Sequence, residues 1–461
     1  MSSAPRPSPA PTRALLASAE AGAIVAWRGP EAITAARLLS DVAAVAAALP
    51  DSRHVLNFCA DRYRFAVLLL AAIVRRQVTL LPPATTPHVI DAMRAFAPDA
   101  YYVSDDPAIA VDLPRHAIAD GPATIQDCAI EIPMAPADQR VACVFTSGST
   151  GEPQPNFKHW GPLVDDAHAE ARRLGIGPRH TIFGTVPPQH MFGFESTILL
   201  PLLCGAALTA KRLYYPADID AALGAARAPR VLFTTPFHLR AWVESHGPGD
   251  AMPAVSKIVS ATAPLSAGLA RTAEARTGAE LHEIYGCTEA GQVATRRTAE
   301  TDEWHTLEGL RVWNVGEQAM VAGGHVERPT ALGDVIEPKG DGTRFLLHGR
   351  TADMVNIAGK RNSIGYLNHH LTAIAGVEDG VFFLPDTADD DGVTRLAAFV
   401  VAPALDAARI LAHLRERLDP VFLPRPLIKV ERLPRQLTGK LTRESLLALA
   451  REHGIGAHHR G

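Results

Sequence analysis

The sequence predicts an α/β fold, with a large N-terminal domain of layered α/β sheets and a small, mobile α+β C-terminal domain. Between residues 31 and about 270, helix-like patterns alternate with short β-rich runs, which indicates largely parallel strands. These runs lie at residues 54–58, 142–145, 181–186, 230–234 and 257–260. Because the chain has 461 residues, a usual domain size of roughly 100–200 residues predicts more than one core.

The C-terminal residues show a different order of elements. The pattern there predicts a helix at 367–375, strands at 380–384 and 395–401, an amphipathic helix at 410–418, a strand at 427–430 and a helix at 443–452. In the amphipathic helix, apolar residues recur at spacings of three and four and so share one face. We therefore expect the N-terminal domain at 1–350, with a loose tail at 1–13, and the C-terminal domain at 351–461.

Charge and composition exclude several classes of protein. A net charge of −4 argues against a nucleic-acid partner. The 5 cysteines are scattered and form no CxxC pair, which fits a reducing cytoplasm and suggests neither a zinc site nor a disulfide framework. The first residues lack the apolar segment of a signal peptide, and the longest apolar stretch is interrupted by Pro201 and Gly205. We expect a cytoplasmic protein without membrane insertion that acts on small molecules.

A run of glycine and hydroxyl residues follows one apolar strand. The run VFTSGSTG contains Thr146, Ser147, Gly148, Ser149, Thr150 and Gly151. Glycines allow backbone N–H groups to wrap around phosphate oxygens, and hydroxyl groups add further donors. Taken alone, the run is equally typical of a flexible surface turn. It is not a Walker A loop, because the GxxxxGK[ST] pattern is absent.

Several further motifs occur in a fixed order after this loop. They are VPPQHMFG at 186–193, SATAPL at 260–265, YGCTEAG at 285–291, and single residues at Asp334, Arg350, Arg361 and Lys440. Together with the glycine loop, they resemble the adenylate-forming superfamily of acyl-CoA synthetases, aryl-CoA ligases, peptide-synthetase adenylation domains and firefly luciferase. One such match is weak evidence, whereas the ordered set is specific.

The resemblance implies ATP and Mg²⁺ as cofactors and gives roles to the motif residues. Glu289 would bind Mg²⁺, Thr288 would hydrogen-bond the α-phosphate, and Tyr285 would stack on adenine. Thr262 and Ala263 belong to the adenine-facing segment. Without this context, Glu289 would be an ordinary solvated residue and Tyr285 a core residue.

Four residues complete the expected nucleotide site. Asp334 would accept hydrogen bonds from the ribose hydroxyls, although a Gly-Asp pair is also common in turns. Arg350 and Arg361 match the hinge-side and nucleotide-side arginines of the superfamily. Lys440 matches its C-terminal catalytic lysine, a cation that would bridge the attacking carboxylate and the α-phosphate.

Two positions depart from the superfamily pattern. The lysine that usually ends the glycine loop is replaced by Gln154, and Lys158 follows four residues later. We expect Lys158 to contact phosphate in its place, with a solvent-facing lysine as the alternative. At the expected hinge, Ala352 replaces the usual Asp or Lys, which puts the regulation of domain rotation in doubt.

The sequence indicates less clearly which acid is activated and which acceptor receives the acyl group. His190, Phe192 and Phe237 could line an acyl pocket or pack in the core. A compact N-terminal region and the variant glycine loop resemble ligases of the aryl polyene and xanthomonadin pigment pathways, which implies an acyl carrier protein as a partner. We expect an aryl or fatty acid ligase that forms an acyl-adenylate and then a thioester on CoA or phosphopantetheine. The alternatives are a non-thiol acceptor or a nucleotide-binding regulatory protein that has lost its chemistry.

Overall fold

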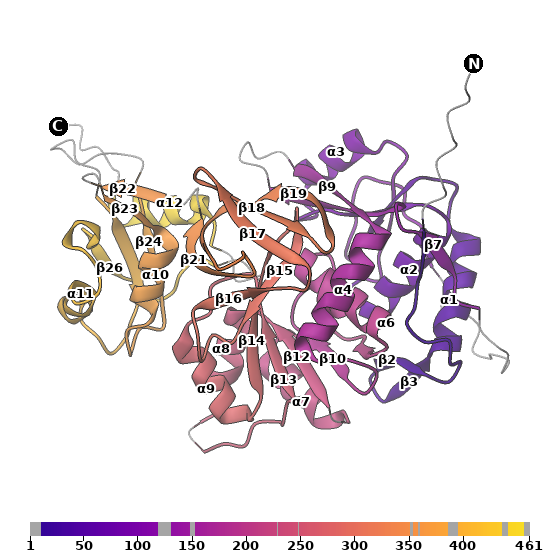
Figure 1. Cartoon of the computed structure of the whole chain (residues 1–461), viewed down its shortest axis with the longest axis horizontal. Helices are drawn as coiled ribbons and strands as arrows, with labels where there is room; N and C mark the ends of the chain where they lie inside the picture. The colour runs from indigo at the N-terminus through magenta and orange to yellow at the C-terminus, as the bar shows by residue number, and fades with distance from the viewer. Residues whose placement is uncertain are drawn as a thin grey trace.

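The computed structural model confirms the predicted α/β class and contains several mixed sheets (Figure 1). The structure describes residues 11–118, 131–147, 153–227, 229–247, 249–350, 354–357, 360–385, 395–435 and 441–455. Among these residues, no helix combines the length and apolar character needed to cross a membrane.

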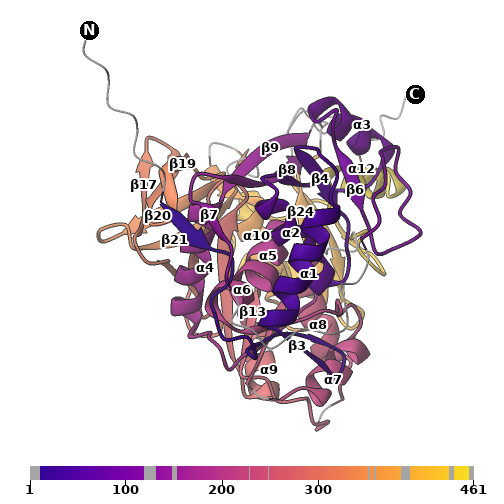
Figure 2. The ribbon, with the colours of Figure 1, turned by 90° about the vertical axis from the view of Figure 1, so that its right-hand side faces the viewer.

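The first sheet has five strands and is largely parallel. Its order is β6 (Tyr101–Val103), β4 (His54–Asn57), β5 (Val78–Leu81), β8 (Arg140–Ser147) and β9 (Pro153–His159), with only β9 antiparallel to its neighbour. Helices α1 (Ala35–Ala48) and α2 (Arg62–Val74) pack against each other, as Figure 2 shows, and α3 (Pro87–Phe96) follows β5. Ser147 pairs with Pro153, so β8 and β9 flank the glycine-rich run.

The second sheet has eleven strands and forms the centre of the molecule. Its order is β20 (Asp334–Lys339), β21 (Arg344–Arg350), β16 (Glu303–Thr306), β15 (Gly291–Arg296), β14 (Glu280–Cys287), β13 (Lys257–Ser260), β12 (Arg230–Thr234), β10 (Thr181–Gly184), β11 (Ala207–Thr209), β2 (Ile24–Arg28) and β3 (Glu31–Thr34). The strands from β14 to β2 are parallel, whereas β15, β16, β20 and β21 extend the sheet antiparallel. The parallel part confirms the predicted strands at 181–186, 230–234 and 257–260.

Helices cover both faces of the parallel part. One face carries Phe233 and Val259, which pack with α4 (Trp160–Leu174) and α6 (Leu200–Cys204). The other face carries Leu232 and Ile258, which pack with α7 (Pro216–Ala225), α8 (Pro236–Glu244) and α9 (Ala267–Thr277). Neighbouring residues of one strand thus face opposite layers, as the two-residue repeat of a strand requires. Both faces are buried, which explains the continuous apolar runs in the sequence.

Smaller sheets complete the N-terminal part. The strands β17 (Leu310–Val315), β18 (Gln318–Gly323) and β19 (Val326–Ala331) form an antiparallel sheet, and β1 (Thr12–Ala14) pairs with β7 (Met134–Pro136). A π-helical turn, η1 (Glu195–Leu199), links α5 (Met191–Phe194) to α6. Such turns are rare and often occur at functional sites.

The C-terminal elements form hydrophobic clusters of their own. They comprise β22 (Met354–Ile357), β23 (Lys360–Ser363), α10 (Ile364–Thr372), β24 (Asp379–Phe383), β25 (Ala397–Val401), α11 (Ala407–Arg415), the 3₁₀ turn η3 (Pro420–Phe422), β26 (Leu427–Lys429) and α12 (Arg443–Glu452). Figure 1 shows most of them in gold at one end of the molecule, where α10 contacts β21. The predicted helices and strands of this part are confirmed within a few residues. In the predicted amphipathic helix at 410–418, the apolar residues Ile410, Leu414 and Leu418 are buried, whereas Leu411 is only half-buried.

Candidate active site

Three of the predicted motifs lie at the ends of parallel strands of the large sheet. The segment 186–193 follows β10, the segment 260–265 begins at the end of β13, and the segment 285–291 begins within β14. Because the carboxyl ends of parallel strands meet at one edge of a sheet, these motifs lie along the same edge. This edge is the usual place for a ligand in an open α/β sheet.

The turn at residues 287–291 carries Thr288 and Glu289. It joins β14 to β15, and Cys287 pairs with Gly291. Gly291 has φ of +76°, and a Cβ on Gly286 would lie 2.4 Å from the Gly291 carbonyl oxygen. Both glycines are therefore needed for this turn. The Glu289 side chain is exposed to solvent at the tip.

Lys158 reaches this turn from the five-stranded sheet. It lies on β9, and its Nζ donates hydrogen bonds to the carbonyl oxygens of Thr288 and Glu289, the latter at 3.4 Å. The Lys158 side chain is half-buried, with its ammonium group directed at this turn. The ammonium group connects the strand that follows the glycine-rich run with the turn that carries Thr288 and Glu289.

Beside the glycine-rich run, Thr146 pairs with Gln154 across β8 and β9. Asn156 Nδ2 lies 3.5 Å from Thr146 Oγ1 and 3.2 Å from the Gln154 carbonyl oxygen. Sequence reasoning did not single out Asn156, since an isolated Asn in a strand belongs to no motif. Ser147 ends β8, and Gly148, Ser149, Thr150 and Gly151 lie outside the described residues.

The structure brings Tyr285 and Asp334 together. Tyr285 Oη donates a hydrogen bond of 2.8 Å to Asp334 Oδ2. The Tyr285 ring packs against Trp304 and Phe345, with ring centres 5.7 and 5.6 Å apart. The ring is thus largely a core residue, with its hydroxyl group directed to the carboxylate. Asp334 is also the register partner of Arg350, whose backbone ends β21.

The other expected nucleotide residues are placed in part. Thr262 and Ala263 are exposed, and Thr262 has φ of +79°, a strained value for a residue with a branched side chain. Arg361 lies on β23, where its backbone pairs with that of Asn356. Lys440 and Ala352 lie outside the described residues.

The candidate acid-binding residues separate into two places. His190 precedes α5 as its N-cap residue, and the Phe192 ring lies 6.1 Å from that of Phe233 on the sheet. A Cβ on Gly193 would lie 2.0 Å from the Pro187 carbonyl oxygen, so this segment folds tightly on itself. Phe237 instead lies on α8, is 44% exposed and packs beside His238.

Arg62 fixes the start of the segment at 186–193. Its guanidinium group is fully buried and donates hydrogen bonds to the carbonyl oxygens of Gly184, Val186 and Lys211 and to Thr197 Oγ1, at 2.7 to 3.2 Å. Burial, aided by the nearby Arg212, lowers the pKa of Arg62 to about 9. Sequence reasoning missed this residue. Its signal is a basic side chain at the start of the very apolar helix RYRFAVLLLAAIV.

A second buried polar group lies behind the turn at 287–291. We call it the buried acid cluster; it consists of Asp166, Glu170, Glu195, Ser196, Gln292 and His325, all at most 7% exposed. Ser196 Oγ donates to Glu170 Oε1 at 2.8 Å and accepts from Gln292 Nε2 at 3.3 Å. A Cβ on Gly291 would lie 2.9 Å from Asp166 Oδ2 and 3.0 Å from Glu195 Oε1. The carboxyl groups therefore press against the base of the turn.

Burial controls the charge of this cluster. It raises the pKa of Glu170 to about 8. Burial also raises the pKa of Glu195 well above its usual range, and the adjacent Asp166 carboxyl raises it further. Both shifts favour the neutral carboxyl form, which predominates for Glu170 at pH 7. Sequence reasoning missed the cluster, whose only signal is the acidic Glu195 inside the apolar run FGFESTILL.

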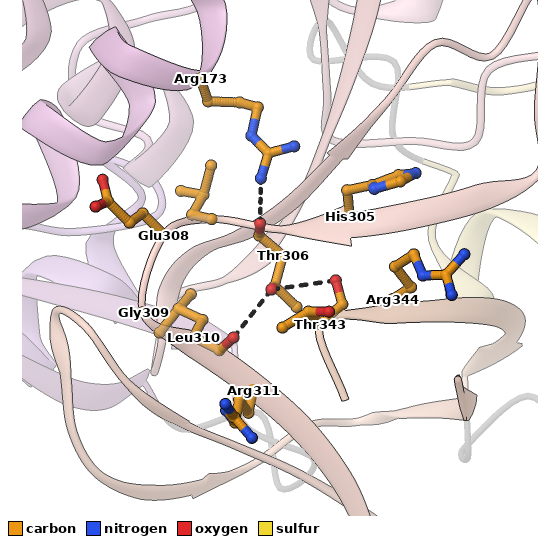
Figure 3. Close-up of a pocket in the computed structure, with 10 residues that line it drawn as sticks. Arg173, His305, Thr306, Glu308, Gly309, Leu310, Arg311, Thr343 and Arg344 are labelled. Carbon is orange, nitrogen blue, oxygen red and sulfur yellow. Dashed lines mark hydrogen bonds between the residues drawn. The ribbon is translucent and has the colours of Figure 1, made fainter. Parts of the chain in front are cut away.

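A surface cavity of about 410 Å³ lies away from these motifs. It is lined by residues of α4, β16, the following loop, β17 and the start of β21, including Arg173, His305, Glu308, Arg311 and Arg344 (Figure 3). Arg173 donates to the Thr306 carbonyl oxygen at its rim. None of the predicted site residues that the structure describes lines this cavity. Among the described residues, no set of three His, Cys, Asp or Glu side chains is placed to hold a metal ion.

Comparisons with known proteins agree with the predicted superfamily. The model of the family described as AMP-binding enzyme matches residues 6–319, so the chain belongs to this family. The 4-coumarate–CoA ligase of Rhodobacter capsulatus is 32% identical over 289 residues, which cover 62% of this chain and 70% of the relative. The 3-hydroxybenzoate–CoA/4-hydroxybenzoate–CoA ligase of Thauera aromatica is 25% identical over 383 residues, covering 74% and 71% of the two chains.

Among solved structures, ATP-bound MatB from Rhodopseudomonas palustris has a TM-score of 0.78 at 20% identity. The match covers 94% of this chain and 97% of that chain. At this level of identity, the similarity establishes the fold alone.

Proposed function

We propose that the protein is an ATP-dependent carboxylic acid ligase that forms an acyl-adenylate and then transfers the acyl group to a thiol. The observation that carries this proposal is the arrangement along one sheet edge. Lys158 binds the backbone of Thr288 and Glu289, Tyr285 binds Asp334, and the segment at 186–193 follows β10 at the same edge of the sheet. Nucleotide, phosphate and acid would thus meet at adjacent positions.

The chain's own residues would orient the nucleotide. In this proposal, the Asp334 carboxylate accepts hydrogen bonds from the ribose hydroxyl groups, while Tyr285 holds that carboxylate in place. Thr262 and Ala263 are exposed, which leaves their backbone open to the adenine. Lys158 supplies the positive charge that Gln154 cannot supply beside the phosphates. Positioning and charge stabilisation are the main tasks when two anions must react.

Glu289 is a suitable ligand for Mg²⁺. Its carboxylate is exposed at the tip of the turn, as a metal shared with phosphate oxygens requires. Mg²⁺ usually takes one or two protein carboxylates and fills its other positions with water and phosphate. The ion would supply charge neutralisation at the phosphates.

The C-terminal part would complete the reaction. We propose the division into a domain at 1–350 and a mobile domain at 351–461, which delivers Lys440 to the reacting carboxylate. Arg350 and Arg361 would act at the hinge and the nucleotide, and the pairing of Arg350 with Asp334 in the sheet is consistent with this. Ala352 would allow rotation without a charged hinge contact.

The names of the relatives favour an aryl acid over a fatty acid. Two of them are described as 4-coumarate and hydroxybenzoate ligases acting with CoA. Phe192 provides an aromatic ring at the acid-binding segment. Together with the resemblance to aryl polyene and xanthomonadin ligases, this supports transfer to CoA or to the phosphopantetheine of an acyl carrier protein.

Two measurements test the proposal. Exchange of pyrophosphate into ATP should depend on an added aryl acid, and release of AMP should require CoA or a phosphopantetheinylated carrier protein. Lys440→Ala should nearly abolish exchange while ATP binding persists, because the lysine acts on charge that develops in the transition state. Acid-dependent exchange without any thiol dependence would favour a non-thiol acceptor. ATP binding without exchange for any acid would favour the regulatory alternative.

A further inference from the structure

Asp166 and Glu195 of the buried acid cluster contact the end of the turn at 287–291. A Cβ on Gly291 would lie 2.9 Å from Asp166 Oδ2 and 3.0 Å from Glu195 Oε1, so the two carboxyl groups leave no room for a side chain there. The backbone N–H of Gln292, the next residue, lies 3.5 Å from Asp166 Oδ2. The position of this end of the turn therefore depends on where the two carboxyl groups lie.

The same turn carries the residues proposed to contact phosphate and Mg²⁺. Lys158 holds its tip through the carbonyl oxygens of Thr288 and Glu289, and Gly291 follows Glu289 by two residues. A movement of Gly291 would therefore move Thr288 and Glu289 as well. A misplacement of about 1 Å at a reacting centre can lower the rate by about 100-fold.

The contact between Asp166 and Glu195 requires a proton. The two side chains are hydrogen-bonded to each other, and both residues are at most 4% exposed. Because ionised carboxylates only accept hydrogen bonds, one of the two groups must be protonated. If both were ionised, two like charges would repel each other in a buried site. The pair therefore keeps its arrangement only while it holds this proton.

Several titratable groups from other elements face the pair. Burial raises the pKa of Glu195 well above its usual range, the carboxyl groups of Asp166 and Glu170 raise it further, and the Lys158 ammonium group opposes them. His325 Nε2 lies 3.6 Å from Asp166 Oδ1. The balance of these contributions favours the protonated pair near neutral pH.

His325 connects the pair to the surface. It lines a cavity of about 280 Å³ together with the polar or charged residues Asp165, His168, Arg172 and Glu308. Neither ring nitrogen of His325 has a hydrogen-bond partner among the described residues. An imidazole can take up a proton at one nitrogen and release it from the other, which gives the buried pair a route for proton exchange with solvent.

We infer that the proton shared by Asp166 and Glu195 holds the turn at 287–291 in the position needed for adenylation, and that its loss at alkaline pH displaces Thr288 and Glu289. Asp166 and Glu195 are positioning residues, because they act on the substrates only through the turn. The inference rests on the proposed function, since it assigns regulation by pH to the same site. The proton is bound at lower pH and lost as pH rises, so activity falls on the alkaline side.

The first experiment follows pyrophosphate exchange between pH 7 and 9 in the wild type and in Glu195→Gln. In the wild type, kcat should fall by about tenfold per pH unit above the pKa of the pair, as expected for loss of one essential proton, and the Mg²⁺ requirement should rise. Glu195→Gln replaces the shared proton with an amide N–H that does not ionise. This variant should retain most of the activity at pH 7 and lose the alkaline fall.

The second experiment uses a second variant and a matched control. Asp166→Asn fixes an N–H on the other member of the pair and should also lose the alkaline fall in kcat. Glu170→Gln is the control, because Glu170 is a buried carboxyl group of the same cluster that accepts from Ser196 instead of bracketing Gly291. This control should keep the alkaline fall. Circular dichroism at each pH monitors folding.

Four outcomes would overturn the inference. A constant kcat in the wild type across this range would show that the pair does not control the turn. An equal alkaline fall in the wild type, Glu195→Gln and Asp166→Asn would assign it to another group. Loss of the fall in Glu170→Gln would assign it to the charge of the whole cluster, and unfolding of both variants at pH 7 would assign the proton to the fold.

These outcomes are distinct from failure of the proposed function. In each of them the wild-type protein still exchanges pyrophosphate in the presence of an acid. Absence of exchange in the wild type with every acid would overturn the proposed function, and the inference with it.

Discussion

Two buried polar sites flank the acid-binding segment, and they differ in how their hydrogen bonds are satisfied. Arg62 carries a full charge, yet its donors meet three carbonyl oxygens and one hydroxyl group. The buried acid cluster instead contains three carboxyl groups that interact with one another and with the side chains of Ser196 and Gln292, and burial raises the pKa of Glu170 and Glu195. Both sites carry a desolvation cost, which Arg62 offsets with backbone acceptors and the cluster reduces by favouring the neutral form of its glutamates.

This difference separates a fixed support from a pH-dependent one. A buried group whose partners are backbone carbonyl oxygens stabilises one arrangement of the chain. A buried group that lowers its desolvation cost by remaining neutral makes stability depend on pH instead. On this basis, Arg62 supports the backbone at the start of the segment 186–193, and the cluster is the pH-dependent part.

The largest expected effect comes from removing Arg62. Arg62→Leu leaves four buried acceptors without their donor and should lower the free energy of unfolding by about 3–5 kcal/mol. Denaturant unfolding measures this loss. Arg75→Leu is the control at the end of the same helix, because Arg75 is exposed and, within the described part of the chain, its side chain donates to a single carbonyl oxygen. Similar losses for both variants would contradict the structural role of Arg62.

Lys158 should have the next largest effect, on activity. Lys158→Ala removes the ammonium group from the turn at 287–291, and loss of charge-assisted hydrogen bonds of about 1.5–3 kcal/mol corresponds to a roughly 10- to 100-fold lower kcat/KM for ATP. Gln154→Lys in this background should restore part of the loss, because it returns the charge to the usual loop position. If the ATP kinetics of Lys158→Ala are unchanged, Lys158 does not replace the missing lysine, and the glycine-rich loop binds the phosphates through neutral donors alone.

Glu170 should make stability depend on pH. Its pKa rises from an ordinary value of 4.5 to about 8 on folding, so the folded protein binds more protons between these values. Stability therefore falls as pH rises through this window, by up to about 1.4 kcal/mol per pH unit for this group. Glu170→Gln cannot ionise and should show a shallower loss between pH 6 and 8. If the free energy of unfolding changes equally with pH in the wild type and in Glu170→Gln across this range, Glu170 does not titrate as expected.

The smallest expected effect comes from Tyr285, whose hydroxyl group donates to Asp334 at the edge of the candidate site. Tyr285→Phe removes one hydrogen bond to Asp334, whose side chain is only half-buried and can turn to water. A loss of about 1 kcal/mol predicts a roughly fivefold higher KM for ATP with little change in kcat. A fall in kcat with no change in KM would contradict a role in holding the ribose-binding carboxylate.

The sequence predicted the parallel core and the C-terminal elements because their signals are local. Fully buried strands appear as short apolar runs, and α12 occupies the predicted range at 443–452. The antiparallel extension of the large sheet was not predicted. Strands such as EWHT in β16 and DVIEPK in β20 are only partly buried and mix polar with apolar residues, which gives no clear period.

The motifs in the sequence by themselves determined the family, the order of the site segments and the residue types expected at the nucleotide. These properties depend on short stretches of sequence, in which the residue types indicate both the local backbone conformation and the chemistry. Only the tertiary structure decided that Lys158 meets Thr288 and Glu289, 130 and 131 residues away, and that Tyr285 holds Asp334. It alone revealed the buried acid cluster, because α4, η1, β15 and the loop before β19 contribute separately to it. Contacts between distant segments depend on packing and strand register, which no local pattern of residues encodes.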